Sequence, residues 1–275
     1  AHHRILFHED ITGKEITSHL LNAVKKLKNV RMYEYTTLLD ILCDGSKCCG
    51  GIIRWPDGRE EQVEADYVIL ATGGIGGTYK HSTNFKHLTG DGVEIARRHN
   101  IELKNLDYVQ IHPTTLYSDN KEERSFLISE SVRGEGARLY DKNMNRFVDE
   151  LLPRDLLTQE IYKQMEKDGT DFVWEDLRTI PRDELISHFP NIIEHCSQAG
   201  YDVFHECIPI VPAQHYFMGG IKVNHNSKTS MDHLYAVGET ACNGVHGKNR
   251  LASNSLLESL VFAKRAAKEI ADERR

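Results

Sequence analysis

Three short motifs carry basic side chains that could hold a small anion. His112 lies in Gln110–Thr114 (QIHPT) directly before a proline, which keeps it extended, and His215 lies in Pro212–Gly220 (PAQHYFMGG). Arg250 stands a few residues before the predicted start of a helix and supplies a permanent cation. A single histidine is more often structural than catalytic, and a solvated arginine before a capped helix is the alternative for Arg250. The motifs therefore indicate a binding site only if the fold brings them together.

Two further motifs combine acids with arginines. Ser129–Arg138 (SESVRGEGAR) alternates acidic and basic residues around two glycines, and by composition alone it is compatible with a charged loop. Pro153-Arg154-Asp155 places Arg154 in the first turn of a helix, where its charge opposes the helix dipole. This unfavourable placement suggests a functional role for Arg154. An ion pair with Asp155 or another carboxylate is the alternative explanation.

Two apolar runs end in glycine and predict a surface for a flat or phosphorylated ligand. Tyr67–Gly74 (YVILATGG) is a strand that leads into a glycine turn, where the main chain can approach a ligand closely. Leu234–Glu239 (LYAVGE) places Glu239 at the end of a second strand, where an acid can accept hydrogen bonds from ribose or ribitol hydroxyls. A tight turn without a ligand and a surface acid are the alternatives.

A third ligand-binding element is the start of the last helix. Ser253, Asn254 and Ser255 are all residues that favour the N-cap position, and a long helix follows over Ser255–Asp272. The free amides and the positive dipole end of such a helix stabilise negative charge. A reduced flavin develops such a charge, although a plain capped helix beside a solvated arginine is also possible.

The elements that must position these motifs alternate along the chain. Helices are predicted over 16–27, 93–99, 154–167 and 255–272, and a small antiparallel meander is predicted from strands over 30–35, 38–43, 51–55 and 61–64. Tyr67–Ala71 and Leu234–Val237 are apolar strands of the kind found in buried α/β sheets. From Asn105 to Phe217 strand-like segments alternate with polar helices. The pattern predicts an α/β domain that is interrupted by an inserted α+β domain.

The composition is that of a soluble globular protein. The 275 residues are 40% hydrophobic and 27% charged, with a formal net charge of −7 and no apolar run near the roughly 20 residues of a membrane span. Ala1–Asp10 has no apolar signal-peptide core. The acidic balance argues against nucleic acid as the main partner. We therefore expect a cytoplasmic protein that associates with neither nucleic acid nor membrane.

The six cysteines show no metal-binding pattern. They form no CxxC pair and no zinc spacing, and the adjacent Cys48 and Cys49 are poorly placed for a structural disulfide. We expect free thiols in a reducing compartment and no metal site.

Taken together, the motifs resemble one protein family. The segments YVILATGG, GDGVEIARRH, QIHPTTLY, SESVRGEGARL, PRD, PAQHYFMGGI, LYAVGE and GKNRLASNSLLE follow the order and spacing of the succinate dehydrogenase/fumarate reductase flavoproteins. This resemblance covers almost the whole chain. Within the group, the ending ASNSLLE is similar to the L-aspartate oxidases, whereas the dehydrogenase and reductase subunits usually read GANSLLD.

The resemblance implies an α/β fold with a glutathione-reductase-like FAD-binding domain and an inserted α+β capping domain. Residues 1–104 and 218–275 would form the FAD-binding domain, and residues 105–217 the cap. The family's opening GxGxxG turn and the C-terminal helical domain of the aspartate oxidases have no counterpart in the sequence. We therefore expect an incomplete FAD-binding domain that retains little or no FAD.

The resemblance also implies roles for individual residues. The substrate contacts would be His112, Ser129, His215 and Arg250, with Ser129 in the place of the threonine that the aspartate oxidases carry. The catalytic residues would be Arg154 and Glu130, with Arg154 transferring the proton. The contacts to a non-covalently bound FAD would be Glu239, Ser255 and Leu256. Arginine and imidazole donors suit the two carboxylates of such a substrate.

The implied activity is the oxidation of L-aspartate to iminoaspartate, the first step of quinolinate and NAD biosynthesis. Oxygen or fumarate would accept the electrons, and the product would pass to quinolinate synthase. A fumarate reductase or succinate dehydrogenase flavoprotein is the alternative from the same class. A non-catalytic domain is the alternative from a different class.

Overall fold

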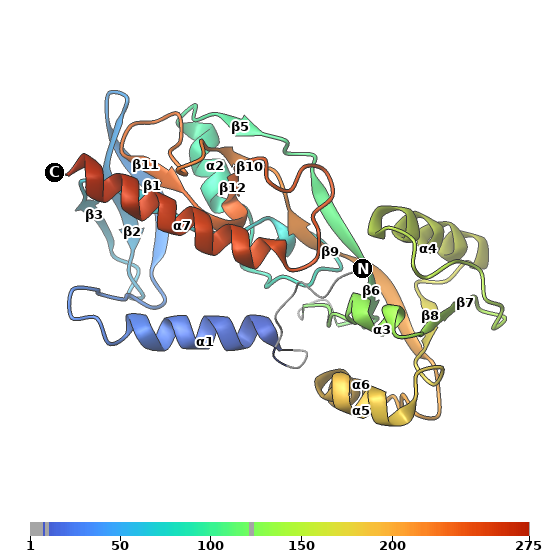
Figure 1. The fold of residues 1–275 in the computed structure, drawn as a ribbon. Helices are drawn as coiled ribbons and strands as arrows, with labels where there is room; N and C mark the ends of the chain where they lie inside the picture. Colours follow the sequence, from blue (N-terminus) through green and yellow to red (C-terminus); the bar gives the residue numbers. More distant parts are fainter. Residues whose placement is uncertain (1–7, 9–10, 121–123, 275) are drawn as a thin grey trace. The chain divides into compact units, whose positions relative to one another are not determined.

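A computed structural model describes residue 8 and residues 11–120 and 124–274 as two compact units (Figure 1). Unit 1 consists of Ala1–Ala23, Gly76–His87 and Ile111–His215. Unit 2 consists of Val24–Ile75, Leu88–Gln110 and Tyr216–Arg275. Each unit is thus assembled from segments that are distant in sequence. Most of Ala1–Asp10, where we predict no signal peptide, lies outside the described residues.

A four-stranded sheet supplies the core of unit 1. Its strand order is β6-β9-β8-β7, with β7–β8 and β8–β9 antiparallel. The strands are β6 (Val109–Leu116), β9 (Ile208–Phe217), β8 (Val173–Asp176) and β7 (Arg138–Tyr140). The helices are α1 (Thr12–Val24), α3 (Glu130–Gly134), α4 (Arg154–Asp168), α5 (Arg182–His188) and α6 (Pro190–Gln198), and η1 (Gly76–Thr78) is a 3₁₀ turn. Ile208 and Ile210 are fully buried, so the inner strand β9 contributes to the apolar core.

Helix α4 shows how the sequence sets the ends of an element. Pro153 occupies the N-cap position, where the missing amide costs no helical hydrogen bond, and Gly169 ends the helix with φ 66°. Leu157 and Ile161, four residues apart on one face, are completely buried. The helix over 154–167, predicted from the proline before it and the glycine beyond it, is confirmed.

Unit 2 contains the predicted meander and two smaller sheets. The meander is β1 (Thr37–Asp44), β2 (Lys47–Arg54) and β3 (Glu60–Glu64). The smaller sheets have the orders β12-β10-β5, from Ala241–Cys242, Gly220–Lys222 and Leu103–Lys104, and β11-β4, from Leu234–Ala236 and Val68–Leu70. The prediction of a further strand over 30–35 is wrong. Tyr35 has a left-handed backbone (φ 56°) and is 88% exposed, which is incompatible with a paired strand.

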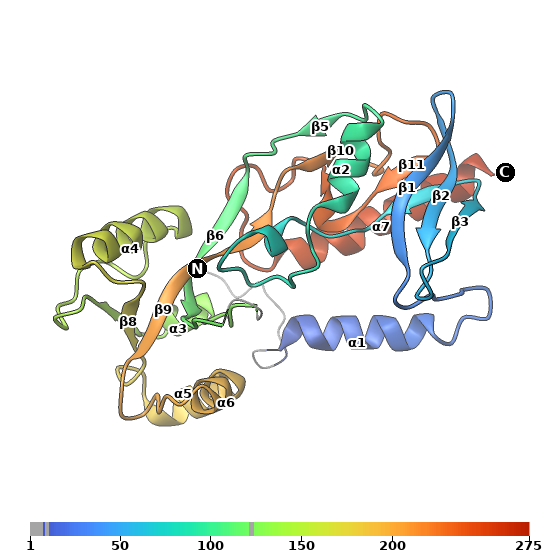
Figure 2. The ribbon, with the colours of Figure 1, turned by 180° about the vertical axis from the view of Figure 1, so that it is seen from behind.

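The two predicted apolar strands pair in parallel, as an α/β domain requires. Ala236 of β11 lies opposite Leu70 of β4. Leu70 is buried but Ile69 is 46% exposed, so β4 is buried on only one face, contrary to the fully buried strand that we expected. Helices α2 (Asp91–Arg98) and α7 (Asn254–Glu273) lie on opposite sides of the strands of this unit (Figures 1 and 2).

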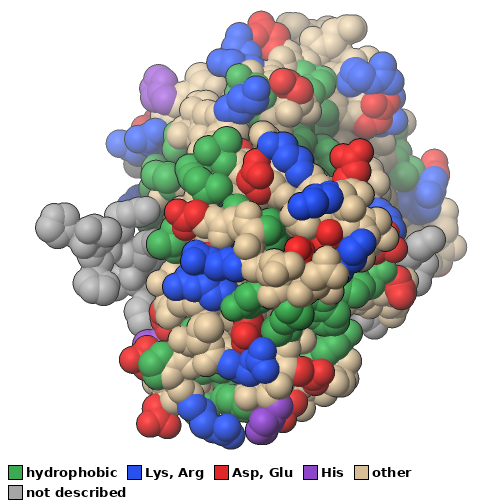
Figure 3. Space-filling model, turned by 90° about the vertical axis from the view of Figure 1, so that its right-hand side faces the viewer, with side chains coloured by type: hydrophobic (Ala, Val, Ile, Leu, Met, Phe, Trp, Pro, Cys, Tyr) green, Lys and Arg blue, Asp and Glu red, His purple; other side chains and the backbone are tan. Residues whose placement is uncertain are grey.

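The surface carries charges of both signs. On the face drawn in Figure 3, the described Lys and Arg side chains are interspersed with Asp and Glu, and hydrophobic side chains lie between them. This face therefore presents mixed charge instead of a basic block. Across the described parts of the chain, no helix has both the length and the apolar character that crossing a bilayer requires.

Candidate active site

Two of the predicted substrate-binding residues, His112 and His215, lie ring against ring in unit 1. They sit on the neighbouring strands β6 and β9, with ring centroids 5.3 Å apart and ring planes at 63°. The Nδ1 atom of His215 is 2.9 Å from the hydroxyl of Thr83, and that of His112 contacts the backbone of Thr114 at 3.0 and 3.2 Å. Each imidazole is therefore oriented through Nδ1 by the protein itself.

The environment of His112 keeps its imidazole neutral. The side chain is 1% exposed. Burial holds the pKa of His112 well below its usual range, and electrostatic interactions with His215, Arg154 and Arg133 lower this pKa further. A neutral imidazole still has one N–H donor, so His112 can bind a carboxylate without carrying a charge.

The predicted catalytic pair forms an ion pair between the starts of two helices. Glu130 is the first residue of α3, and Arg154 is the first residue of α4. The Oε2 atom of Glu130 accepts a hydrogen bond from Nε of Arg154 at 2.7 Å and forms an ion pair with Nη2 at 2.6 Å. The Arg154 side chain is 10% exposed and that of Glu130 is 49% exposed. The carboxylate thus offsets the unfavourable position of Arg154 at the positive end of α4.

Ser129 has a structural contact that the sequence did not single out. It is the N-cap residue of α3, and its Oγ accepts a hydrogen bond from Ser131 N at 3.3 Å. This cap positions Glu130, the next residue. The proposed contact between Ser129 and the substrate stays a prediction.

The sequence analysis did not single out two buried ionisable groups near this pair. Arg133 on α3 is buried, and its Nη1 donates to the backbone oxygen of Glu150 at 2.6 Å. Burial lowers the pKa of Arg133, although Glu175 and Glu130 oppose this effect. Burial raises the pKa of Glu175 on β8 to about 8, against the opposing charge of Arg133. Glu175 is therefore mostly protonated at neutral pH, and its only sequence signal is an acid within the strand-like run FVWED.

In unit 2, Glu239 lies at the carboxyl end of two parallel strands. It belongs to the 3₁₀ turn η2 (Gly238–Thr240) that follows β11, and its Oε1 accepts a hydrogen bond from Phe217 N at 2.8 Å. Gly74 follows β4, and a Cβ atom built there would lie 2.4 Å from Oε1 of Glu239. Only glycine leaves room for this carboxylate. The strand-end position predicted for Glu239 is confirmed, and its contact with FAD stays a prediction.

Arg250 is held by its main chain and by its side chain in unit 2. Its backbone oxygen accepts a hydrogen bond from Nε2 of Gln110 at 2.8 Å, and its guanidinium carbon lies 4.8 Å from the ring centroid of Tyr216. The side chain is 5% exposed. The structure brings His112 and His215 together within unit 1. The predicted convergence of Arg250 with them stays a prediction.

The start of α7 differs from the capped helix that the sequence suggested. Ser253 occupies the N-cap position with φ 64°, and its side chain makes no capping hydrogen bond. The first-turn amides therefore lack a side-chain cap from this residue. Ser255 and Leu256 lie half-buried in this first turn. The geometry suits an anionic group at the positive end of α7.

The residues present in unit 2 fit a flavin. Both ring nitrogens of His246 are buried and have no hydrogen-bond partner among the described residues. Burial, with a smaller contribution from Arg250, lowers the pKa of His246 to about 4, so the ring is neutral and its polar atoms are unsatisfied. The start of α7 and the strand-end Glu239 add sites for a negative ring edge and for hydroxyls. These three features match the polar atoms, the negative ring edge and the hydroxyl groups of FAD.

The family model described as "FAD binding domain" matches residues 2–256. The chain therefore belongs to the FAD-binding domain family, and FAD is the cofactor of this family. Its fold is the mixed α/β fold of the succinate dehydrogenase/fumarate reductase flavoproteins.

Among individual proteins, the chain is similar to bacterial L-aspartate oxidases. It is 53% identical over 267 residues to the L-aspartate oxidase of Clostridium perfringens and 48% identical over 267 residues to that of Clostridium acetobutylicum. Each alignment covers 97% of the chain and 61% of the relative, so the chain spans about three fifths of their length. Among solved structures, an E. coli quinol fumarate reductase chain aligns with a TM-score of 0.88 and 32% identity, over 97% of this chain and 49% of that one.

Proposed function

We propose that this protein oxidises L-aspartate to iminoaspartate with FAD as its cofactor. The proposal is supported by the L-aspartate oxidases to which the chain is similar and by the polar residues of unit 1. The observation that carries it is the Arg154–Glu130 ion pair, whose cation lies close enough to His112 to lower the pKa of this buried imidazole. A proton-transferring pair beside a carboxylate-binding group is what amino-acid oxidation needs.

The substrate carboxylates are bound by His112, His215 and Arg250, with Ser129 as a further polar contact. Each hydrogen bond to a charged carboxylate contributes roughly 1.5–3 kcal/mol. The rings of His112 and His215 are already oriented through Nδ1, so little conformational freedom is lost when the substrate binds. Arg250 adds the permanent charge that the neutral His112 lacks.

Arg154 transfers the proton and Glu130 assists it. A guanidinium stays protonated in proteins, so it can pass a proton only by releasing one as it receives another. Glu130 is in direct contact with Nε and Nη2 of Arg154 and is half-exposed, so it can exchange the proton with solvent. The alternative is that the ion pair only holds two helix starts in place, and the two roles differ in their kinetics.

Glu239, Ser255 and Leu256 hold the cofactor in this proposal. When bound, FAD supplies the two-electron acceptor for a substrate C–H bond, and oxygen or fumarate takes up the electrons afterwards. Residues 105–217 act as the capping domain, and their largest part, Ile111–His215, belongs to the separate compact unit 1. In the cell the enzyme acts in the cytoplasm and passes iminoaspartate on to quinolinate synthase for NAD biosynthesis.

Substrate preference tests the proposal. The FAD-loaded protein should release ammonium from L-aspartate with oxygen or fumarate as acceptor and should oxidise succinate far more slowly. The similarity to fumarate reductase supports one other outcome, in which succinate and fumarate are interconverted and L-aspartate is inert. That outcome would replace the proposal, and FAD binding without turnover of either substrate would favour a non-catalytic domain.

A further inference from the structure

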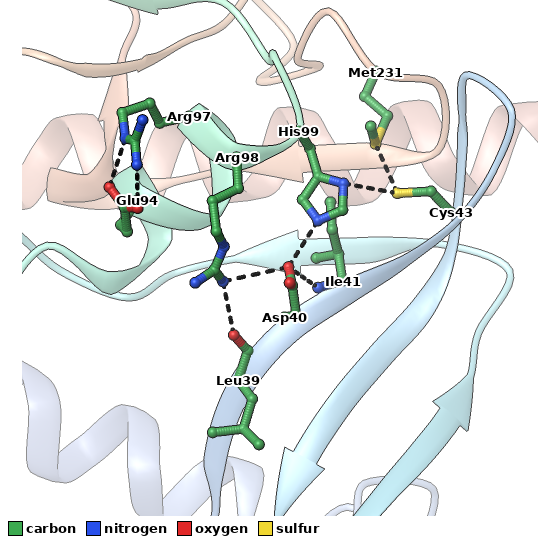
Figure 4. Close-up of polar contacts among 9 residues, drawn as sticks. All are labelled: Leu39, Asp40, Ile41, Cys43, Glu94, Arg97, Arg98, His99 and Met231. Carbon is green, nitrogen blue, oxygen red and sulfur yellow. Dashed lines mark hydrogen bonds and ion pairs between the residues drawn. The ribbon is translucent and has the colours of Figure 1, made fainter.

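A second group of reactive side chains lies in unit 2, and none of its members belongs to the candidate active site. Asp40 and Cys43 are on β1, and His99 is the residue that ends α2 (Figure 4). The Nε2 atom of His99 lies 2.8 Å from Oδ1 of Asp40, and its Nδ1 atom lies 3.5 Å from Sγ of Cys43. A carboxylate, an imidazole and a thiol in this order can convert the thiol into a nucleophile.

Asp40 determines which nitrogen of His99 carries the proton. Burial raises the pKa of Asp40, but hydrogen bonds from His99 and from Ile41 N and the charge of Arg98 outweigh burial, so the pKa of Asp40 is lowered. The ionised carboxylate can only accept, and we therefore assign the proton of the neutral imidazole to Nε2. The Nδ1 atom is then an acceptor that faces the thiol.

Cys43 at rest is a thiol with a base in contact. Burial raises its pKa, and the neighbouring Cys48, Cys49 and Asp40 raise it further. Its proton has two acceptors, Nδ1 of His99 at 3.5 Å and Sδ of Met231 at 3.7 Å, and the thioether is the weaker of the two. Because the thiolate is disfavoured at rest, Cys43 reacts only if His99 takes its proton.

A second thiol lies directly across the hairpin. Cys43 of β1 pairs with Cys48 of β2, one step beyond Asp44 and Lys47 at the two-residue turn. The amide of Cys48 donates to Asp232 O at 2.9 Å, so the cysteines form a pair without mutual hydrogen bonds. In such pairs the Cα atoms are about 4.5 Å apart, within the range that a disulfide bridges. Cys43 is exposed and Cys48 is buried, so a dissolved oxidant meets Cys43 first.

We propose that Cys43 is a peroxide-reactive thiol that forms a disulfide with Cys48. His99 Nδ1 takes the thiol proton, and the sulfur of Cys43 attacks one oxygen of hydrogen peroxide and breaks the O–O bond. Cys43 becomes a sulfenic acid, and the departing hydroxide recovers the proton from His99 as water. The thiol of Cys48 then displaces the sulfenic hydroxyl as a second water. Two thiols are thereby oxidised by two electrons while one peroxide is reduced to two waters.

The oxidant has a source in the proposed function, because reoxidation of a reduced flavin by oxygen releases hydrogen peroxide. Only this source rests on the proposed function. The reactivity of Cys43 follows from the contacts in unit 2 alone. Adding hydrogen peroxide to the protein in the absence of any substrate tests the thiol, whatever reaction the active site performs.

The test is a peroxide time course on the intact protein, read by mass spectrometry and by a dimedone probe for sulfenic acid. The unaltered protein should lose two hydrogens, and peptide mapping should join Cys43 to Cys48. Cys48→Ser should instead trap a dimedone adduct on Cys43. His99→Gln should slow the oxidation of Cys43 by about 10²-fold or more, the low end of what a positioned general base contributes. His225→Ala, which removes an exposed imidazole elsewhere in unit 2, should leave the rate unchanged.

A structural role for the group makes different predictions. Asp40→Asn keeps the shape of the side chain, so this variant can replace His99→Gln if the latter unfolds the protein. Because Asp40 acts by positioning His99, Asp40→Asn should lower the rate of Cys43 oxidation and alter the dependence of this rate on pH. An oxidation rate and pH profile that stay the same in both variants would overturn the proposal. First oxidation at another cysteine, or a bridge that excludes Cys43, would do so as well.

Discussion

The two units differ in the kind of polar groups that they offer to a ligand. In unit 1 they are charged side chains in contact with one another, such as Arg154 with Glu130, and the buried His112 responds to their charge. In unit 2 main-chain features dominate, namely the glycine turn at Gly74 and the start of α7 behind Ser253. Unit 1 thus offers charged side chains in mutual contact, whereas unit 2 offers close backbone approach and the start of a helix.

This difference matches the two ligands that the proposed function requires. A small dicarboxylate is recognised by its charge, which charged and strongly polar side chains match. A flavin is large and flat, so a backbone that can approach it closely and a helix dipole suffice. Substitutions that alter charge in unit 1 should therefore act mainly on turnover, and those that alter the start of α7 in unit 2 should act on the cofactor.

The largest effect is expected from Arg154→Lys. Lysine keeps the charge but loses the two-nitrogen contact with Glu130, so turnover of L-aspartate should fall by about 10²–10⁴-fold, the range of a general acid–base residue. The affinity for a non-reacting dicarboxylate inhibitor should change only a few-fold, because the loss is confined to the transition state. Steady-state kinetics and inhibitor titration measure the two quantities.

The matched control is Arg54→Lys, which alters an exposed arginine–glutamate pair on the meander of unit 2. It should leave both quantities unchanged. If inhibitor binding falls as steeply as turnover in Arg154→Lys, then Arg154 binds a carboxylate and does not transfer the proton.

The next effect concerns the stability of unit 1. The pKa of Glu175 is raised from 4.5 to about 8, so the stability it contributes is fully present below 4.5 and is lost as the pH rises through about 8. Glu175→Gln should remove this loss. The free energy of unfolding of this variant should therefore rise above that of the unaltered protein between about pH 5 and pH 9. The difference should reach a few kcal/mol, at about 1.4 kcal/mol per pKa unit.

Urea unfolding at a series of pH values measures this gain. Glu166→Gln, which changes an exposed acid on α4, is the control and should not show the same slope. A gain for Glu175→Gln that is independent of pH would mean that Glu175 is ionised throughout and that Arg133 neutralises it.

A smaller effect is expected from Ser255→Asp in the first turn of α7. A negative charge there satisfies the helix dipole in place of the cofactor, so FAD affinity should fall by about 10-fold, or about 1.4 kcal/mol, while the melting temperature without FAD stays equal or rises. Ala263→Asp adds the same charge further along α7 and is the control. Equal losses of flavin affinity in the two variants would show that net charge, and not the helix start, is responsible.

The smallest effect is expected from Thr83→Val. The Thr83 hydroxyl lies 2.9 Å from Nδ1 of His215, and its loss frees the ring at a cost of about 1 kcal/mol, or about 5-fold in kcat/KM. Thr83→Ser should restore most of the activity because the hydroxyl returns. Failure of the serine variant to recover would indicate that the threonine methyl group, through packing, is what matters.

The sequence predicted those elements whose ends carry a strong local signal. Pro153 and Gly169 delimit α4, and the glycines after two apolar runs mark the parallel pair of β4 and β11. The segment 30–35 shows the limit of this approach. It has strand-forming residues, but Tyr35 turns the backbone into the left-handed region, and no local pattern announced that turn.

For the candidate site, residue types could be predicted but their surroundings could not. Glu130 was expected to act together with Arg154, and the structure shows an ion pair between these two residues. The buried positions of Arg133 and Glu175 depend on how β8 and α3 pack, which involves residues far apart in sequence. The spacing of residues along the chain gives no information about such long-range burial.

The most direct test of the central claim is a single-turnover experiment without oxygen. The protein is loaded with FAD, and L-aspartate or succinate is added while the visible flavin absorbance is followed. We predict that L-aspartate bleaches the flavin and that ammonium and oxaloacetate appear as iminoaspartate hydrolyses, while succinate leaves the flavin oxidised. Bleaching by succinate with no response to L-aspartate would contradict the proposed function.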